Sequence, residues 1–417
     1  MVLPGQAAPG RLDGRLARIA GHAEHVVRVP SGHEPSVFGR PLDTGAPVES
    51  PVTVTRRRPG RRAGITAALA MSPIAAWRFA QAYRARAGYP HRHPPELEPA
   101  DLGLPFEPVE VPSDGGLRLP GWWIPARGDP TGPAVLLVHG WESARDRTLP
   151  NAAILHAAGL HVLTIDVRGH GENPVEALPV TPGEFGADAL AGLRWLLERR
   201  DVSRGGVLGH SMGGVGALLA AAAEPRTAAV VAGSTPADPY RLTRQTFRLA
   251  RLPLPGPLAY PLAWLTTHVV LEPRGHTVRS VSAAGAVARY RGPLLLVHGD
   301  ADQVIPIAHL RRLVRRARRS RAGDVAAAPL DVLELPGADH SYLYEIPAYR
   351  ASIARFLARW LAGPIAPDAA AAAALAVEVE RPPERRHGFS ALEDEPGGLR
   401  TVWRAIRAGA RGARRTV

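Results

Sequence analysis

The chain has 417 residues, a formal net charge of +13 and no cysteine. Without cysteine, a disulfide framework, a thiolate metal site and a cysteine nucleophile are all excluded. All 51 basic residues are arginine, beside 43 glycines and 42 prolines, so we attribute much of the charge to a GC-rich coding sequence. No zinc-finger spacing or aromatic-interleaved basic motif accompanies the charge, and we expect no nucleic-acid partner.

The N-terminal part of the chain divides into two segments before the main domain. Residues 1–62 are rich in proline, glycine and arginine without apolar periodicity, which predicts a disordered leader. Residues 63–103 are expected to form a helix and a linker. The uncharged run at 63–77 is too short to span a membrane and starts too late for a signal peptide. It predicts a surface or docking helix that continues to about Arg86.

Residues 104–362 have the pattern of an α/β domain. Two runs at 106–111 and 117–124 flank a turn and predict an antiparallel opening hairpin. Apolar runs then alternate with helix-compatible stretches, which is typical of a doubly wound, mostly parallel sheet covered on both faces. The predicted strands are 134–138, 161–167, 205–208, 228–232, 293–297 and 332–335, and the predicted helices are 149–158, 184–199, 213–223, 308–319 and 348–361.

Two further segments do not fit this alternation. Residues 238–279 are too long for a simple crossover, and their apolar side chains, such as Phe247, Tyr260 and Trp264, predict a small helical lid over the active-site mouth. Residues 363–417 predict a low-complexity tail. Within this tail, helical spacing of apolar residues around Trp403 indicates either a basic amphipathic helix on an anionic membrane surface or a solvated tail.

The strongest motif is Gly209-His210-Ser211-Met212-Gly213-Gly214, which follows a predicted strand and precedes an alanine-rich helix. Glycines on both sides of a serine permit the sharp strand-to-helix turn of a nucleophile elbow. Ser211 is therefore the predicted nucleophile. An ordinary glycine-rich turn is the alternative, and the residues described next argue against it.

A serine hydroxyl needs a base to accept its proton and a third group to orient that base. Two loops at the carboxyl ends of predicted strands supply candidates, since open α/β sheets gather their sites there. His340 follows the last strand and is the predicted base, while Asp302 and Asp300 follow the strand before it. The backbone amides of Trp141 and Met212 are the predicted oxyanion hole.

The remaining motifs carry structural predictions. His139 and His298 precede glycine at strand ends, where we expect them to serve loop structure. The segment 166–172 predicts a tight glycine turn fixed by Asp166 and Arg168, in preference to a second acid–base pair. No metal-ligand set or dinucleotide fingerprint is present in the sequence, so we expect neither a metal nor a cofactor.

Taken together, these motifs resemble the α/β-hydrolase superfamily over about residues 104–362. The elbow resembles monoacylglycerol-lipase-like and serine-aminopeptidase-like members, and the opening at 109–125 resembles Bem46-type hydrolases. The sequence from Asp302 to Pro306 is similar to the family's usual acid loop, which favours Asp302 over Asp300 as the acid.

The resemblance implies that the chain hydrolyses a carboxylic ester or related acyl bond of a small-molecule substrate, without a cofactor. Peptidase, thioesterase and acyltransferase activities stay open, as does a non-catalytic scaffold at a membrane surface. We expect a cytoplasmic location, with peripheral membrane contact as an alternative. The sequence does not indicate an oligomeric state.

Overall fold

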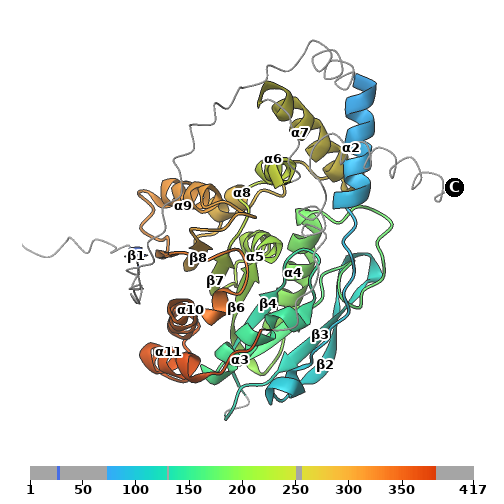
Figure 1. Cartoon of the computed structure of the whole chain (residues 1–417). Helices are drawn as coiled ribbons and strands as arrows, with labels where there is room; N and C mark the ends of the chain where they lie inside the picture. Colours follow the sequence, from blue (N-terminus) through green and yellow to red (C-terminus); the bar gives the residue numbers. More distant parts are fainter. Residues whose placement is uncertain (1–25, 29–72, 129–130, 250–255, 382–417) are drawn as a thin grey trace, which may run out of the picture.

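The computed structural model describes residues 26–28, 73–128, 131–249 and 256–381 (Figure 1). Within these residues, nine strands form one sheet in the order β1-β9-β8-β7-β6-β4-β5-β3-β2. Neighbouring strands run parallel from β1 to β5, while β3 pairs antiparallel with both β5 and β2. The predicted doubly wound sheet with an antiparallel opening hairpin is therefore confirmed.

All eight predicted strands are present, and β6 extends beyond its predicted bounds at both ends. The strands are β1 (Val26–Arg28), β2 (Glu107–Pro112), β3 (Arg118–Ile124), β4 (Gly132–Val138), β5 (His161–Ile165), β6 (Val202–His210), β7 (Ala229–Gly233), β8 (Leu294–Gly299) and β9 (Leu330–Leu335). The ninth strand, β1, lies in the leader for which no regular structure was predicted. Three residues are too few for a strand to be recognised from its pattern.

Helices cover both faces of the sheet, as the alternating sequence pattern predicts. One face carries α4 (Pro182–Leu197), α5 (Met212–Ala223), α8 (Ala283–Arg289) and α9 (Ala308–Arg321). The other face carries α3 (Leu149–Ala157), α10 (Pro347–Trp360) and α11 (Pro367–Ala376). Each face buries its own apolar core, because parallel strands rich in leucine and valine are hydrophobic on both sides.

Local sequence explains where α4 begins. Thr181 caps the helix, its hydroxyl accepting a hydrogen bond from the Gly183 amide at 3.1 Å, while the Glu184 carboxylate accepts from the Thr181 amide at 2.8 Å. This reciprocal pair is a capping box, and Pro182 occupies the first helical position, where proline is tolerated.

Three helices form a cap over one end of the sheet: α2 (Pro73–Ala87), α6 (Pro239–Leu249) and α7 (Gly256–Leu271). Figure 1 shows α2 and α7 side by side, away from α10 and α11. The cap has a small apolar cluster of its own, separate from the two main cores, made of Phe247, Leu262, Ala263, Ala76, Phe79, Tyr83 and Tyr240. The predicted helical insertion is confirmed. The N-terminal helix, predicted as a surface or docking helix, is a third part of the cap.

The C-terminal boundary differs from the one predicted at residue 362. The alanine run forms α11, whose Ala370, Ala371 and Ala374 are buried, and the helix packs against α10 and α3. Small alanine side chains allow this close approach, whereas composition alone indicates low complexity. The predicted amphipathic segment around Trp403 lies outside the described residues, as do 63–72 of the predicted first helix.

The described part of the chain has no helix that is both long and apolar enough to cross a membrane.

The register of the strands places the site. β6 lies between β4 and β7, where Gly209 pairs with Val138 and His210 with Gly233. Ser211 therefore emerges in the middle of the carboxyl edge of the sheet. β8 and β9 end together, with Gly299 opposite Leu335, so the loops that follow them lie side by side.

Candidate active site

Ser211 lies in a strained turn between β6 and α5. Its backbone angles are φ 55° and ψ −119°, and its amide donates to the Gly233 carbonyl at 2.8 Å. The flanking glycines are required by space, because a Cβ on Gly209 would lie 2.1 Å from the Gly213 carbonyl oxygen, and a Cβ on Gly213 would lie 2.1 Å from the Val138 carbonyl oxygen. Strain of this kind costs about 1–3 kcal/mol and is concentrated at functional sites.

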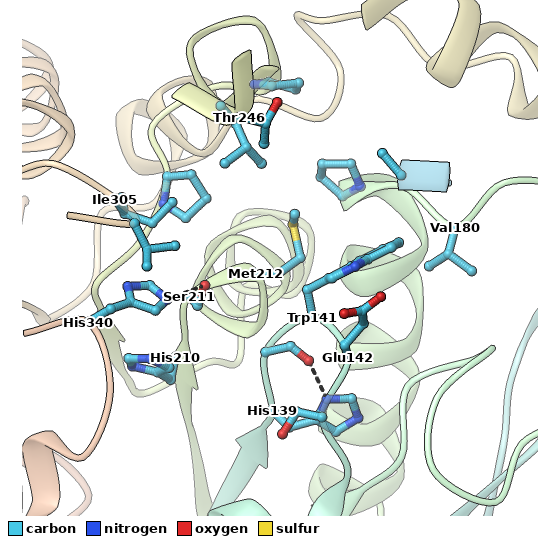
Figure 2. Close-up of a pocket in the computed structure, with 18 of the residues that line it drawn as sticks. His139, Trp141, Glu142, Val180, His210, Ser211, Met212, Thr246, Ile305 and His340 are labelled. Carbon is cyan, nitrogen blue, oxygen red and sulfur yellow. Dashed lines mark hydrogen bonds between the residues drawn. The ribbon is translucent and has the colours of Figure 1, made fainter. Parts of the chain in front are cut away.

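The structure brings Ser211, His340 and Asp302 together from three different loops. The Ser211 hydroxyl lies 3.0 Å from His340 Nε2, and His340 Nδ1 lies 2.8 Å from Asp302 Oδ2. Figure 2 shows the His340 ring facing Ser211, with Met212 and Trp141 on the other side of the same space. The His340 side chain is only 15% exposed and that of Asp302 is fully buried.

Asp302 is held as a carboxylate by its surroundings. Burial opposes its ionisation, but hydrogen bonds from His298, His340 and the Ile305 amide outweigh this and lower the pKa of Asp302 below its usual range. The Ile305 amide donates to Oδ1 at 2.7 Å, while Oδ2 lies 2.8 Å from His340 Nδ1 and 3.4 Å from His298 Nε2. The carboxyl group is therefore ionised at neutral pH.

Asp300, the alternative acid predicted from the sequence, makes a different contact. Its side chain is exposed and Oδ1 accepts a hydrogen bond from the Gly337 amide at 2.7 Å. This contact joins the loop after β8 to the loop after β9. Among the hydrogen bonds of the described residues, none connects Asp300 to His340.

The predicted oxyanion amides flank Ser211. The amide of Met212 opens α5, where the helix dipole favours negative charge. A Cβ built on Gly140 would lie 3.4 Å from the Ser211 Cβ, so the loop that carries Trp141 passes directly beside the serine.

His139 fixes the peptide that contains the Trp141 amide. Its Nε2 accepts from the Val167 amide at 3.0 Å, so its proton is on Nδ1, which donates to the Gly140 carbonyl at 2.7 Å (Figure 2). Burial lowers the pKa of His139, which keeps the ring neutral. Because a trans peptide points its N–H away from its C=O, this bond also sets the direction of the Trp141 amide.

The sequence of the chain matches known proteins over the same region. A sequence model of the alpha/beta hydrolase family matches residues 135–353. The chain belongs to the α/β-hydrolase family. It is 31% identical over 238 residues to the Mycobacterium tuberculosis protein Rv2307c, covering 56% of this chain and 72% of that protein. It is 24% identical over 236 residues to human Protein ABHD12B, covering 54% and 61%.

Solved structures show the same fold. An esterase of Pyrococcus furiosus, Pf2001, superposes with a TM-score of 0.52 and 22% sequence identity, over 66% of this chain and 97% of the esterase. The match to the family begins after α2, so the α/β-hydrolase domain recognised by sequence does not include the whole cap.

In this α/β-hydrolase chain, a cavity of about 500 Å³ opens beside Ser211 and His340. Its floor includes Trp141 and Met212, and its lining is mainly apolar. The cap supplies the opposite wall, with side chains from all three helices: Phe79, Tyr83, Leu242, Phe247 and Leu271. A cavity of this size and character suits a lipophilic small molecule.

The aromatic residues of the cap divide between the cavity and the solvent. Phe247 packs edge-on against Phe79 and Tyr83, at 5.6 and 5.7 Å between ring centroids, and the Tyr83 hydroxyl lies 2.7 Å from the Thr246 hydroxyl. The prediction that the insertion faces the nucleophile is confirmed for Phe247. It is wrong for Tyr260 and Trp264, which point outward from α7 and are exposed.

Phe79 and Tyr83 are cavity residues that sequence reasoning missed. Their spacing of four residues places both on one face of α2, which is the signal that could have indicated a packed face.

The glycine turn at 166–172 is structural, and Asp166 and Arg168 have separate partners. Asp166 forms a buried ion pair with Arg145 and accepts from the Arg145 amide at 2.7 Å. Arg168 forms a buried ion pair with Asp188 at 2.5 Å. The predicted pair of Asp166 and Arg168 therefore fixes the turn through neighbouring elements.

His170 in the same turn is fully buried beside Trp141 and His139, and burial lowers its pKa to about 3. Within the described residues, no three histidine, aspartate or glutamate side chains are grouped as a metal site would require.

Proposed function

We propose that the chain is a serine hydrolase that cleaves carboxylic esters through an acyl-enzyme on Ser211. The observation that carries the proposal is the unbroken line of hydrogen bonds from the Ser211 hydroxyl through His340 to the buried carboxylate of Asp302. Such a line activates a serine that is otherwise a weak nucleophile. The strained turn that presents Ser211 at the sheet edge supports the same role.

In the proposed reaction, Ser211 Oγ attacks the carbonyl carbon of the ester while His340 Nε2 takes the hydroxyl proton. The carbonyl oxygen becomes an oxyanion that accepts hydrogen bonds from the amides of Trp141 and Met212. The intermediate collapses to an ester on Ser211, and the alcohol leaves with the proton from His340. Water then attacks this ester with His340 again as base, which releases the carboxylic acid and restores the serine.

The charges of the site suit this sequence of steps. His340 becomes positive when it holds the proton, and the ionised Asp302 at 2.8 Å stabilises that charge. The mainly apolar cavity between Trp141, Met212 and the cap supports a substrate with a lipophilic acyl or alcohol group.

Labelling with a fluorophosphonate, which reacts only with an activated serine, tests the proposal. The wild-type chain should be labelled, and Ser211→Ala and His340→Ala should each lose labelling and lower kcat on soluble esters by about 10⁴-fold or more. Ser341→Ala is the matched control, because Ser341 lines the same cavity and lies next to the base, yet should keep both labelling and turnover.

An unlabelled wild-type chain would indicate a scaffold instead of an enzyme, and full turnover by Ser211→Ala would refute the assignment of the nucleophile. Parallel assays with ester, thioester and amide substrates of increasing chain length then separate esterase from thioesterase and peptidase activity.

A further inference from the structure

The outer surface of the cap carries an unusual group of side chains. Ile74 and Trp77 on α2 are 69% and 52% exposed, and Tyr260 and Trp264 on α7 are 47% and 57% exposed. These four residues are defined here as the cap outer face. The described part of the chain exposes several large hydrophobic side chains. All of the aromatic ones among them belong to the cap outer face.

The geometry of the two helices accounts for this exposure. Residues three or four positions apart lie on one side of a helix, so each pair forms one face. Both helices direct other side chains, Phe79 and Tyr83 from α2 and Leu262 from α7, into the apolar cluster of the cap. Figure 1 shows the two helices side by side at the edge of the molecule, away from α10 and α11.

The charge of the cap is entirely positive. None of the chain's 38 carboxylates lies on α2, α6 or α7. The helices carry six arginines, Arg78, Arg84, Arg86, Arg241, Arg244 and Arg248. Of these, Arg241 is paired with Asp238, the residue before α6, at 3.3 Å. The Arg244 guanidinium lies 3.9 Å from the centre of the Tyr260 ring, so positive charge and an exposed aromatic ring are in direct contact.

From these observations we propose that the cap outer face docks on the surface of an anionic phospholipid membrane. Tryptophan and tyrosine are favoured at the boundary between lipid chains and headgroups, and clustered arginines are attracted to acidic headgroups. Ile74 adds an aliphatic side chain on the same side of α2 as Trp77.

The exposed area favours a membrane over a second copy of the chain. With about 150–250 Å² for each aromatic side chain, roughly half exposed, the face offers on the order of 400 Å². A stable protein interface buries about 800 Å² on each partner, so the face is too small to hold a dimer by itself. Insertion into a lipid surface needs no such complementary area.

The cap outer face and the cavity beside Ser211 share the helix α2, so docking would affect how a substrate reaches the cavity. The side of α2 opposite Trp77 contributes Phe79 and Tyr83 to the wall of the cavity beside Ser211. α2 therefore belongs both to the cap outer face and to the cavity wall, so docking would bring this wall of the cavity close to the lipid surface. The effect on substrate access rests on the proposed ester hydrolysis, whereas the docking itself does not.

Sedimentation of the full chain with phospholipid vesicles tests the docking. We expect the wild-type chain to pellet with vesicles of phosphatidylcholine and phosphatidylglycerol and to stay in solution with phosphatidylcholine alone. The double variant Trp77→Ser with Trp264→Ser should bind the anionic vesicles at least about tenfold more weakly, because each change removes an exposed indole. Higher salt should weaken wild-type binding, since it screens exposed charges.

The matched control is Val325→Ser with Leu375→Ser, which removes two exposed apolar side chains far from the cap helices in the sequence and should bind like wild type. All variants are also assayed on a soluble short-chain ester and by fluorophosphonate labelling. Because Trp77 and Trp264 do not line the cavity, their loss should leave both readouts unchanged. Failure of docking and failure of the proposed hydrolysis are thus measured separately.

Three results would overturn the proposal. The first is a wild-type chain that stays in solution with anionic vesicles, and the second is equal binding by the Trp77 and Trp264 double variant. The third is a wild-type dimer in light scattering that the double variant converts to a monomer, which would make the face a contact between copies. A chain that lacks residues 396–417 serves as a comparison. If this deletion abolished vesicle binding while the Trp77 and Trp264 double variant bound fully, docking would be assigned to the C-terminal tail.

Discussion

Replacing Asp302 with asparagine should abolish most turnover through the tautomer of His340. The Ile305 amide donates to one side-chain oxygen at 2.7 Å, so an asparagine would keep its oxygen there and present its NH₂ to His340. That NH₂ is a donor, and His340 Nδ1 would have to become the acceptor. The ring proton would then lie on Nε2, which could no longer accept the proton of Ser211.

The magnitude follows from the loss of the base. In a serine protease triad the equivalent exchange lowers kcat by about 10⁴-fold, which corresponds to about 5.4 kcal/mol in the activation free energy. We expect a similar loss for Asp302→Asn, with little change in KM because the cavity wall is untouched. Steady-state kinetics on a short-chain soluble ester measure both constants, and a thermal unfolding curve checks that the variant folds.

Asp300→Asn is the control for this experiment. Asp300 is exposed and accepts only the Gly337 amide among its described hydrogen bonds, and an asparagine oxygen can do the same. We expect its kcat to stay within about twofold of wild type, as for a surface substitution that keeps its contact. If Asp302→Asn kept more than about a tenth of the wild-type kcat, or if Asp300→Asn lost more than Asp302→Asn, the tautomer argument would be refuted.

Three further predictions concern neighbouring residues. His139→Ala frees the Gly140 carbonyl and should lower kcat by about 10- to 100-fold, since misdirecting one oxyanion donor forfeits part of its contribution; a loss confined to KM would contradict this. Gly213→Ala places a methyl group 2.1 Å from a backbone oxygen and should lower the free energy of unfolding by about 2–3 kcal/mol; an unchanged urea midpoint would rule the clash out. Burial lowers the pKa of His170 to about 3, so the unfolded chain takes up this proton first as pH falls below about 6.5, and stability is lost towards acid. His170 should contribute about 2 kcal/mol to the loss between pH 7 and pH 5. The loss in His170→Phe should therefore be smaller than in the wild-type chain by this amount, and equal pH dependence in both chains would contradict the prediction.

The parts of the site that could be predicted are those that local sequence or chain order determines. The position of Ser211 in a sharp turn could be predicted because the glycines on both sides of it leave no space for a side chain. The position of His340 beside it could be predicted because His340 follows the last strand, and the carboxyl ends of parallel strands meet at one edge. The choice between Asp302 and Asp300 depended on family resemblance, because two residues in one loop differ only in how the folded loop points them.

The parts that were missed depend on contacts between distant segments. Tyr83 and Thr246 form a hydrogen bond although they are 163 positions apart in the sequence, and no local sequence pattern indicates that they pair. The composition of the alanine run in α11 indicates low complexity. In the structure, however, the small alanine side chains allow this helix to lie against α3 and α10. Tyr260 and Trp264 were expected to face the nucleophile because they are hydrophobic. Hydrophobic character favours burial, but it does not determine the direction in which a side chain points from its helix.

From its separate and small apolar cluster, we expect the cap to be less stable than the sheet. Only Phe247, Leu262 and Ala263 are buried in this cluster, against several dozen residues in the two cores on the sheet. Subglobal opening of such a unit requires far less free energy than unfolding of the sheet. Amide hydrogens of α2, α6 and α7 should therefore exchange with solvent long before those of β6. The cap side of the cavity would then open locally while the side that carries Ser211 stays folded.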